Sequence, residues 1–134
     1  ARQGSTRAPQ WTGGGVVFAP KPRDYSVKMN KKEKAAAIKS ALSAKVAEEK
    51  FIVVDGLAFD EIKTKKMAAV LENLKVNKAL VVLDKKDENV ILSARNIPEV
   101  RTVMSGSVNV YDVLKYGNVV ITKEAVAQIE EVYA

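Results

Sequence analysis

The chain has 134 residues, with 22 Lys and Arg against 16 Asp and Glu, a net charge of +6, and neither Cys nor His. Without Cys there are no disulfides, thiol nucleophiles or cysteine-ligated metals, and without His the commonest general base and metal ligand are missing. Catalysis would have to rest on Lys, Tyr and carboxylates, and we expect no catalytic residue, metal site or cofactor.

The positive charge is concentrated at the amino end. Residues 1–34 hold eight Lys and Arg against two acidic residues, whereas residues 35–134 hold 14 of each sign. A surplus confined to one end is typical of an anion-binding arm on an ordinary domain. No apolar run approaches the roughly 20 residues of a membrane span, and no secretory pattern opens the chain. We therefore expect a soluble intracellular protein with no membrane partner.

Residues 1–29 are predicted to form an extended basic arm, and residues 30–134 a globular domain. The arm contains three of the four prolines and four of the seven glycines of the chain. Proline removes a backbone donor and fixes φ, while glycine leaves the backbone permissive. No regular helix can run through such a segment.

The first helix of the domain is predicted from its amino-terminal cap. Asn30 followed by Glu33 has the spacing of a capping box, in which each side chain bonds the backbone N–H of the other residue. The helix is expected to continue to about residue 49. Its buried stripe is predicted to contain Ile38, Leu42 and Val46.

The remainder alternates between short apolar strands and amphipathic helices. The predicted strands are Phe51–Val54, Ala79–Leu83, Val100–Met104 and 118–121. Helices are expected from Thr64, Glu88, Asn109 and Thr122, with Thr64, Asn109 and Thr122 as caps, and the last helix is expected to bury Val126, Ile129 and Val132. This alternation predicts an α/β fold: a mostly parallel four-stranded sheet with helices on both faces, in a Rossmann-like topology.

Two carboxylates keep an enzymatic alternative open. Asp55 and Asp84 follow predicted strands, where doubly wound folds bind ligands, and either could hold a ribose or a magnesium ion. Asp is also a common turn residue, and neither a dinucleotide fingerprint nor a P-loop lies between a strand and a helix. The alternative function is therefore an α/β nucleotide-binding module or enzyme with an incidental basic tail.

The arm has the residue types of an RNA-binding segment. Its cations can neutralise phosphates, and Trp11 and Tyr25 can stack on bases. The alternative is a solvated linker, but such linkers seldom expose residues like Trp11 and Phe18 to water. The cations are Arg2, Arg7, Lys21, Arg23 and Lys28.

Two further groups extend this interpretation to the domain. Lys31 and Lys32 continue the basic surface onto the first helical turn, where phosphate contact would offset their repulsion by the helix dipole. Arg95 and Asn96 either end a helix or make an additional RNA contact.

The segment ARQGSTRAPQWTGGGVVFAPKPRDYSVKMNKKEKAAAIKSALSAKV resembles the end of the long internal loop, and the following helix, of the bacterial type of large ribosomal subunit protein four. LSARNIPEV, NVYDVLKYGNVVITKEAV and IEEVYA resemble the carboxyl-terminal half of the same family. Family members carry a further amino-terminal part and a loop tip, which we expect to be missing here.

The resemblance implies a structural, non-enzymatic component of the large ribosomal subunit in the cytoplasm. Its loop would bind large-subunit ribosomal RNA and reach toward the peptide exit tunnel, beside neighbouring ribosomal proteins and without a small-molecule substrate. Some bacterial members also bind their own messenger leader. Together with Arg95 and Asn96, the implied RNA contacts are Arg2, Gln3, Arg7, Gln10, Trp11, Gly13, Gly14, Gly15, Lys21, Arg23, Tyr25, Lys28, Lys31 and Lys32.

Overall fold

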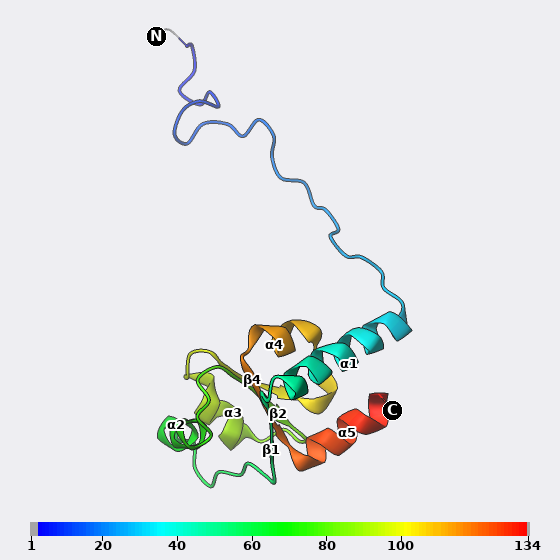
Figure 1. Ribbon diagram of the computed structural model, residues 1–134. Coiled ribbons are helices and arrows are strands. Elements are labelled where there is room, and N and C mark those ends of the chain that lie inside the picture. The colour runs from blue at the N-terminus through cyan, green and yellow to red at the C-terminus, as the bar shows by residue number, and fades with distance from the viewer. Residues whose placement is uncertain (1–2, 134) are drawn as a thin grey trace.

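The sheet has four strands in the order β1-β4-β2-β3, and every pair is parallel. The computed structural model describes residues 3–133, and Figure 1 shows the sheet at the centre of the domain. This arrangement confirms the predicted α/β fold with a four-stranded sheet. The strands are β1 (Phe51–Val54), β2 (Ala79–Leu83), β3 (Val100–Met104) and β4 (Asn118–Thr122).

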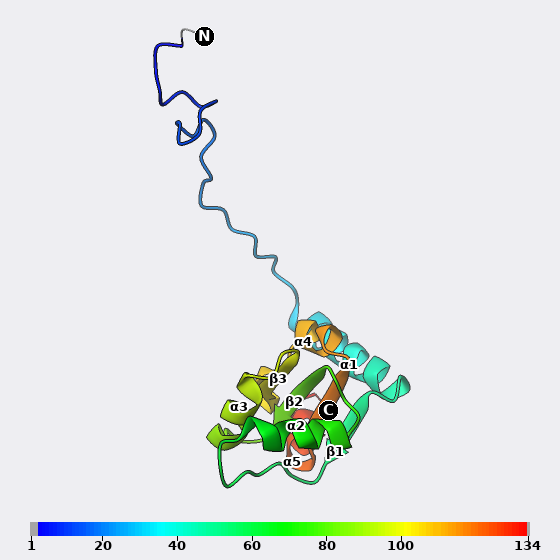
Figure 2. The same ribbon diagram turned by 90° about the vertical axis from the view of Figure 1, so that its left-hand side faces the viewer.

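Helices cover both faces of the sheet, as the alternating pattern predicts (Figures 1 and 2). One core cluster joins α1, α4 and α5 to the sheet, and a second joins α2 and α3 to its other face. A short 3-10 turn, Ser105–Ser107, follows β3. The helices are α1 (Lys31–Ala47), α2 (Thr64–Asn73), α3 (Glu88–Arg95), α4 (Val110–Lys115) and α5 (Lys123–Tyr133).

The position of β2 inside the sheet, between β4 and β3, explains why its sequence is continuously apolar. Its side chains alternate between the two core clusters, with Leu80 and Val82 facing α1, α4 and α5. Ala79, Val81 and Leu83 face α2 and α3. All five side chains are buried, as expected for a parallel strand covered on both faces.

Three of the predicted helix caps are present. The Asn30 backbone N–H donates to the Glu33 carboxylate at 3.2 Å, which is the reciprocal bond of the predicted capping box. The Asp112 N–H donates to the side chain of Asn109 at 2.8 Å, and the Ala125 N–H donates to the hydroxyl of Thr122 at 3.4 Å.

The cap predicted at Thr64 is wrong. Thr64 is the first residue of α2, and Lys63 precedes it at the cap position without a side-chain bond. The Lys63 backbone N–H instead donates to the Ser93 hydroxyl of α3 at 3.0 Å. A contact between helices therefore fixes the start of α2 in place of a local cap.

The predicted inward positions of Val46 and Val132 are also wrong, because these side chains are 58% and 70% exposed. In α1 the buried stripe passes through Ala41 to Lys45, which is four residues on and only 7% exposed. In α5 it passes from Ile129 to the half-buried Tyr133. The rest of each predicted stripe holds, since Leu42 of α1 and Val126 and Ile129 of α5 pack against the core. Only the last buried position of each helix differs from the prediction, by one residue.

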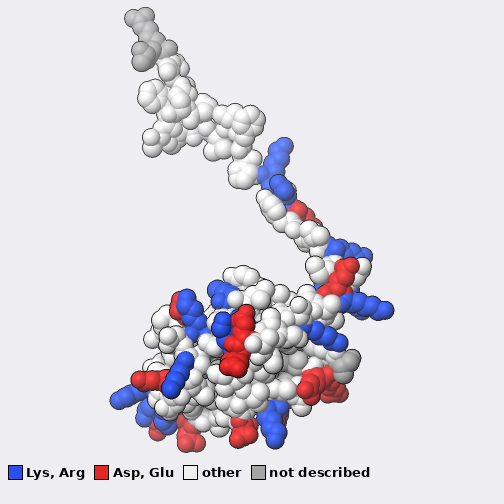
Figure 3. Space-filling model, in the orientation of Figure 1, with Lys and Arg blue, Asp and Glu red and all other residues white. Residues whose placement is uncertain are grey.

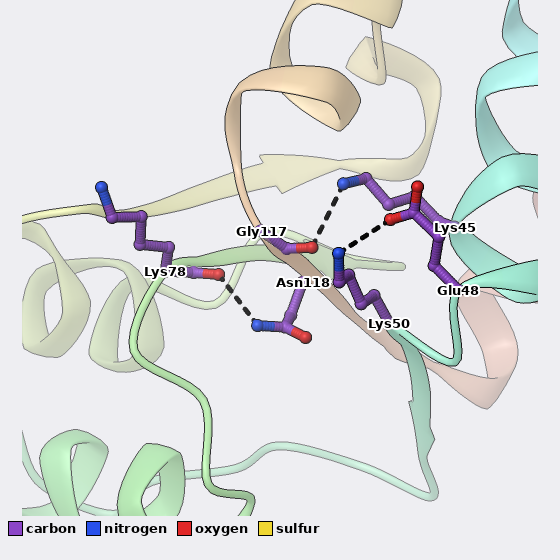
Figure 4. A network of polar contacts seen from close by, with 6 residues as sticks. All are labelled: Lys45, Glu48, Lys50, Lys78, Gly117 and Asn118. Carbon is purple, nitrogen blue, oxygen red and sulfur yellow. Dashed lines mark hydrogen bonds and ion pairs between the residues drawn. The ribbon is translucent and has the colours of Figure 1, made fainter.

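Lys45 can be buried because its ammonium group has a partner. Its Nζ donates to the carbonyl oxygen of Gly117 at 3.2 Å, just before β4 (Figure 4). The aliphatic stem lies along the core while the charged end meets a backbone acceptor, as is common for buried lysines. Within residues 3–133, no helix combines the length and apolarity required to cross a membrane.

We predict that Lys45→Met lowers the free energy of unfolding by about 1 kcal/mol, because the stem is kept while the bond to Gly117 is lost. Val46→Ala, at the neighbouring exposed position, should change it by less than about 0.5 kcal/mol. Urea unfolding followed by circular dichroism measures both. A larger loss for Val46→Ala than for Lys45→Met would contradict the burial of Lys45 in place of Val46.

Asp112 is a fully buried carboxylate that joins α4 to β3. It accepts hydrogen bonds from the Arg101 guanidinium at 2.9 Å and from the Asn109 side-chain amide at 2.8 Å. Its exposed fraction is zero, whereas the Arg101 side chain is half exposed. A buried charge of this kind is tolerated only when hydrogen bonds and an opposite charge satisfy it.

Asp112→Ala is expected to lower the free energy of unfolding by about 2–3 kcal/mol, since it leaves Arg101 and Asn109 without their acceptor. Asp60→Ala, at an exposed position, is the control and should cost less than about 0.5 kcal/mol. Urea unfolding again gives the difference. Equal midpoints for the two variants would show that the bonds to Asp112 do not contribute to stability.

Candidate nucleic-acid interface

Residues 3–29 form an arm that extends away from the domain (Figures 1 and 2). The arm contains no helix or strand, and its side chains are almost all exposed. Among the described residues, no hydrogen bond or ion pair joins residues 3–29 to residues 31–133. The arm is therefore positioned only by its covalent junction with α1.

Large apolar side chains of the arm have no place in the core of the domain. Phe18 is 94% exposed, Tyr25 is 77% exposed and Trp11 is 45% exposed. Neither core cluster includes them. Exposed aromatic groups of this size, gathered in one segment, are typical of a surface that binds a partner.

The amino-terminal part of the arm folds onto itself as a compact turn, residues 7–15. The Gly15 N–H donates to the carbonyl of Arg7 at 2.8 Å, and the Gly14 N–H donates to that of Trp11 at 2.9 Å. The Trp11 N–H donates to the carbonyl of Ala8 at 3.0 Å. These bonds bring the ends of the turn together and hold Trp11 at its outer side.

Glycine is required at two positions of this turn for different reasons. Gly13 has a φ of +76°, which residues with a side chain rarely adopt. A Cβ at Gly14 would overlap the carbonyl oxygen of Ala8. Both glycines are also predicted RNA contacts, and the structure gives them this additional role within the chain.

The segment before the turn packs beside it. The Gln10 side-chain amide donates to the side chain of Gln3, and the Arg7 N–H donates to the Ser5 hydroxyl at 3.2 Å. A hollow of about 500 Å³ results, lined by residues 3–6, Trp11 and Thr12. The turn and the segment beside it thus bring together seven predicted contact residues: Gln3, Arg7, Gln10, Trp11, Gly13, Gly14 and Gly15.

The part of the arm nearest the domain carries the other predicted cations, and Figure 3 shows Lys and Arg side chains along it and at the junction. Lys21, Arg23 and Lys28 are all exposed. The Arg23 guanidinium lies over the Tyr25 ring, 4.4 Å from its centroid, so a cation and an aromatic plane are presented together.

One acidic side chain interrupts this cationic segment. The Ser26 backbone N–H donates to the Asp24 carboxylate at 2.8 Å and lowers the pKa of that carboxyl group. Asp24 therefore shapes the backbone through a local turn, and this use of its carboxylate explains an acidic residue among cations.

The remaining predicted contact residues lie apart from the turn. Lys31 and Lys32 occupy the first two positions of α1 and are exposed, so they continue the cationic segment onto the domain. Arg95 ends α3 and Asn96 is its C-cap, on the face of the sheet opposite α1. The structure does not bring these two residues to the arm. Arg2 lies outside the described residues.

A polar network at the amino ends of the strands is not among the features predicted from the sequence (Figure 4). Lys45 bonds Gly117, Lys50 pairs with Glu48 at 2.9 Å, and the Asn118 side chain donates to the carbonyl of Lys78 at 3.5 Å. Lys50 and Glu48 are two residues apart, whereas the other two contacts join residues 72 and 40 positions apart, which no local pattern indicates. The contacts join α1, β2 and β4 and are structural.

The carboxylates behind the enzymatic alternative have ordinary surroundings. Asp84 accepts a hydrogen bond from the Thr122 hydroxyl at 3.3 Å, which links the carboxyl ends of β2 and β4. Among residues 3–133, no group of three or more acidic side chains is close enough to hold a metal ion. Asp84 thus has a structural role that accounts for its position.

Comparison with known proteins assigns the chain to a family. The sequence profile described as the ribosomal protein L4/L1 family matches residues 1–132. The chain belongs to this family. Because the L4/L1 match begins at residue 1, the arm is part of the family sequence and is not an incidental tail on an enzyme. Membership also agrees with the expectation of a non-enzymatic protein.

Individual relatives in the L4/L1 family are closely similar. Large ribosomal subunit protein uL4 of Lachnoclostridium phytofermentans is 76% identical over all 134 residues, and that of Agathobacter rectalis is 69% identical. The same protein of Thermoanaerobacter sp. is 55% identical. The chain spans 65% of the length of each relative, just under two thirds.

Residues 30–134 are predicted to fold without the arm, since neither core cluster includes a residue of 3–29. Deletion of residues 1–29 should keep one cooperative thermal transition, with a Tm changed by less than about 4 °C. Differential scanning calorimetry of both chains measures this. A broad, non-cooperative transition in the shortened chain would show that the arm contributes to the core.

Proposed function

We propose that this protein is a structural, non-enzymatic component of the large ribosomal subunit in the cytoplasm, whose arm binds large-subunit ribosomal RNA. Membership in the L4/L1 family supports the ribosomal role. The observation that carries the RNA-binding role is the arm itself. It holds +4 of the net charge of +6, from five cations against Asp24, and exposes its aromatic side chains, while none of its described polar contacts reaches the domain.

Ribosomal RNA offers anionic groups for the cations of the arm and flat surfaces for its aromatic rings. Phosphates pair with Lys21, Arg23 and Lys28 and release counterions, while unpaired bases offer flat surfaces to Trp11 and Tyr25. A protein partner of ordinary composition would supply fewer anions at the spacing of these cations. The domain adds no opposing net charge, since residues 30–34 hold three Lys against Glu33 and residues 35–134 hold 14 charges of each sign.

The finer assignments are those that the resemblance to large-subunit protein four implies. The arm would extend into folded RNA toward the peptide exit tunnel, and the domain would lie against RNA and neighbouring ribosomal proteins at the surface. The messenger leader of the chain's own gene would present the same phosphates and unpaired bases, so it is a second RNA partner of the arm.

Binding to transcribed large-subunit ribosomal RNA should weaken steeply with salt. If six to eight of the eight cations in residues 1–34 meet phosphates, the slope of log K against log [KCl] is roughly −4 to −7. Filter binding at several KCl concentrations measures this slope. A flat response would refute the proposed role of the arm.

Replacing Lys21 and Arg23 together by Gln should reduce the magnitude of this slope by about 1.5–2, because two phosphate contacts are lost. The matched control is replacement of Lys65 and Lys66 by Gln. These exposed lysines lie on α2, on the face of the sheet away from α1. Both variants lose two positive charges, so an equal change in slope would indicate non-specific attraction in place of contact by the arm.

A further inference from the structure

The described arm contains a hollow beside Trp11, between the turn of residues 7–15 and the segment before it. It measures about 500 Å³ and is lined by residues 3–6, Trp11 and Thr12. Trp11 is 45% exposed, so much of its indole surface is free. Phe18 and Tyr25 belong to the extended part of the arm and do not line this hollow.

The lining indicates a flat and uncharged ligand. It contains one aromatic ring and small polar groups, including the hydroxyls of Ser5, Thr6 and Thr12, but no charged side chain. A phosphate group is recognised by cations or by charge-assisted hydrogen bonds, which these residues do not offer. A nucleobase matches them, because it stacks on an aromatic face and carries donors and acceptors on its edge.

The hollow is also held in shape before any ligand binds. Three backbone hydrogen bonds close the turn of residues 7–15, and Gly13 and Gly14 permit a path that other residues would obstruct. Gly4, in the segment that forms the other part of the lining, likewise has a positive φ of 68°. A preorganised site loses less conformational entropy on binding than an extended segment does.

We propose that this hollow binds one unpaired nucleobase of RNA, stacked on the indole of Trp11, while the cations of the arm bind the adjoining phosphates. The inference rests on the proposed RNA-binding function and names the element that the arm recognises. The favoured target is a base outside a helix, since a base inside a duplex presents no free face.

Trp11 reports on its own occupancy, because it is the only tryptophan of the chain. The full chain is titrated with single-stranded oligoadenylate, and tryptophan emission is recorded as binding proceeds. An abasic ribose-phosphate oligomer of equal length supplies the same phosphates without bases. Polarisation of end-labelled oligomers measures binding in both cases. Stacking should quench Trp11 emission with oligoadenylate, whereas the abasic oligomer should bind without quenching.

Two variants test the contribution of the Trp11 ring and that of the shape of the hollow separately. Trp11→Ala should weaken oligoadenylate binding by about 5- to 100-fold, the loss expected for one stacked base, and should leave binding of the abasic oligomer unchanged. Gly14→Ala should reduce both quenching and oligoadenylate affinity, since its Cβ would displace Ala8. Gly56→Ala, in the loop after β1 and outside the arm, is the control, because its Cβ would meet nothing within 4 Å.

The outcomes distinguish this inference from the function on which it rests. If neither oligomer binds, both the proposed function and the nucleobase site fail. If the two oligomers bind equally and Trp11 emission does not change, phosphate binding stands and the nucleobase site is overturned. Quenching that is equal in Gly14→Ala and Gly56→Ala would overturn the preformed hollow. Circular dichroism of each variant confirms that the domain, which lies outside residues 3–29, is folded.

Discussion

The simultaneous pairing of β4 with β1 and β2 is the constraint on which the rest of the structure depends. β4 is the last strand in the sequence, yet it lies between the first two, and β1 pairs with no other strand among the described residues. Val119 and Ile121 face one layer of helices while Val120 faces the other. A slip of one residue in β4 would exchange these faces, so a single register fixes both halves of the core.

The same strand positions the arm. Lys45, near the end of α1, bonds Gly117 immediately before β4, and Ala41 packs in the cluster that contains Val119 and Ile121. The second half of α1 is therefore held by the carboxyl-terminal part of the chain. Since the arm continues from the first turn of α1, its direction of departure depends on contacts made by residues that lie far away in sequence.

The sequence predicts most of this fold because its strongest signals are local. Strands buried on both faces read as continuous apolar runs, and Asn30 and Asn109 mark helix starts through bonds to residues three positions away. The prediction is wrong where a contact with a residue distant in sequence decides which side chain is buried. Lys45 is buried in place of Val46 because a carbonyl group before β4 receives its ammonium group. Nothing near Lys45 in the sequence indicates that acceptor.

The candidate interface is likewise predictable from the sequence only in part. Its cations and aromatics are visible in composition, since they stand among prolines and glycines with no helical or strand period. The compact turn is not visible there, because it depends on how closely Gly14 approaches the backbone of Ala8. Three neighbouring glycines predict a permissive backbone, but which of them is sterically required follows only from the path of the chain.

The extended part of the arm suits a partner that surrounds it. Phe18 and Tyr25 are 94% and 77% exposed, and Lys21, Arg23 and Lys28 are exposed beside them. The Arg23 guanidinium lies over the Tyr25 ring, so a charge and an aromatic plane stand together. A flat surface meets only one side of an extended segment and would leave part of this apolar area in water. A partner that encloses the segment, as folded RNA would, can cover the aromatic rings and pair with the cations at the same time.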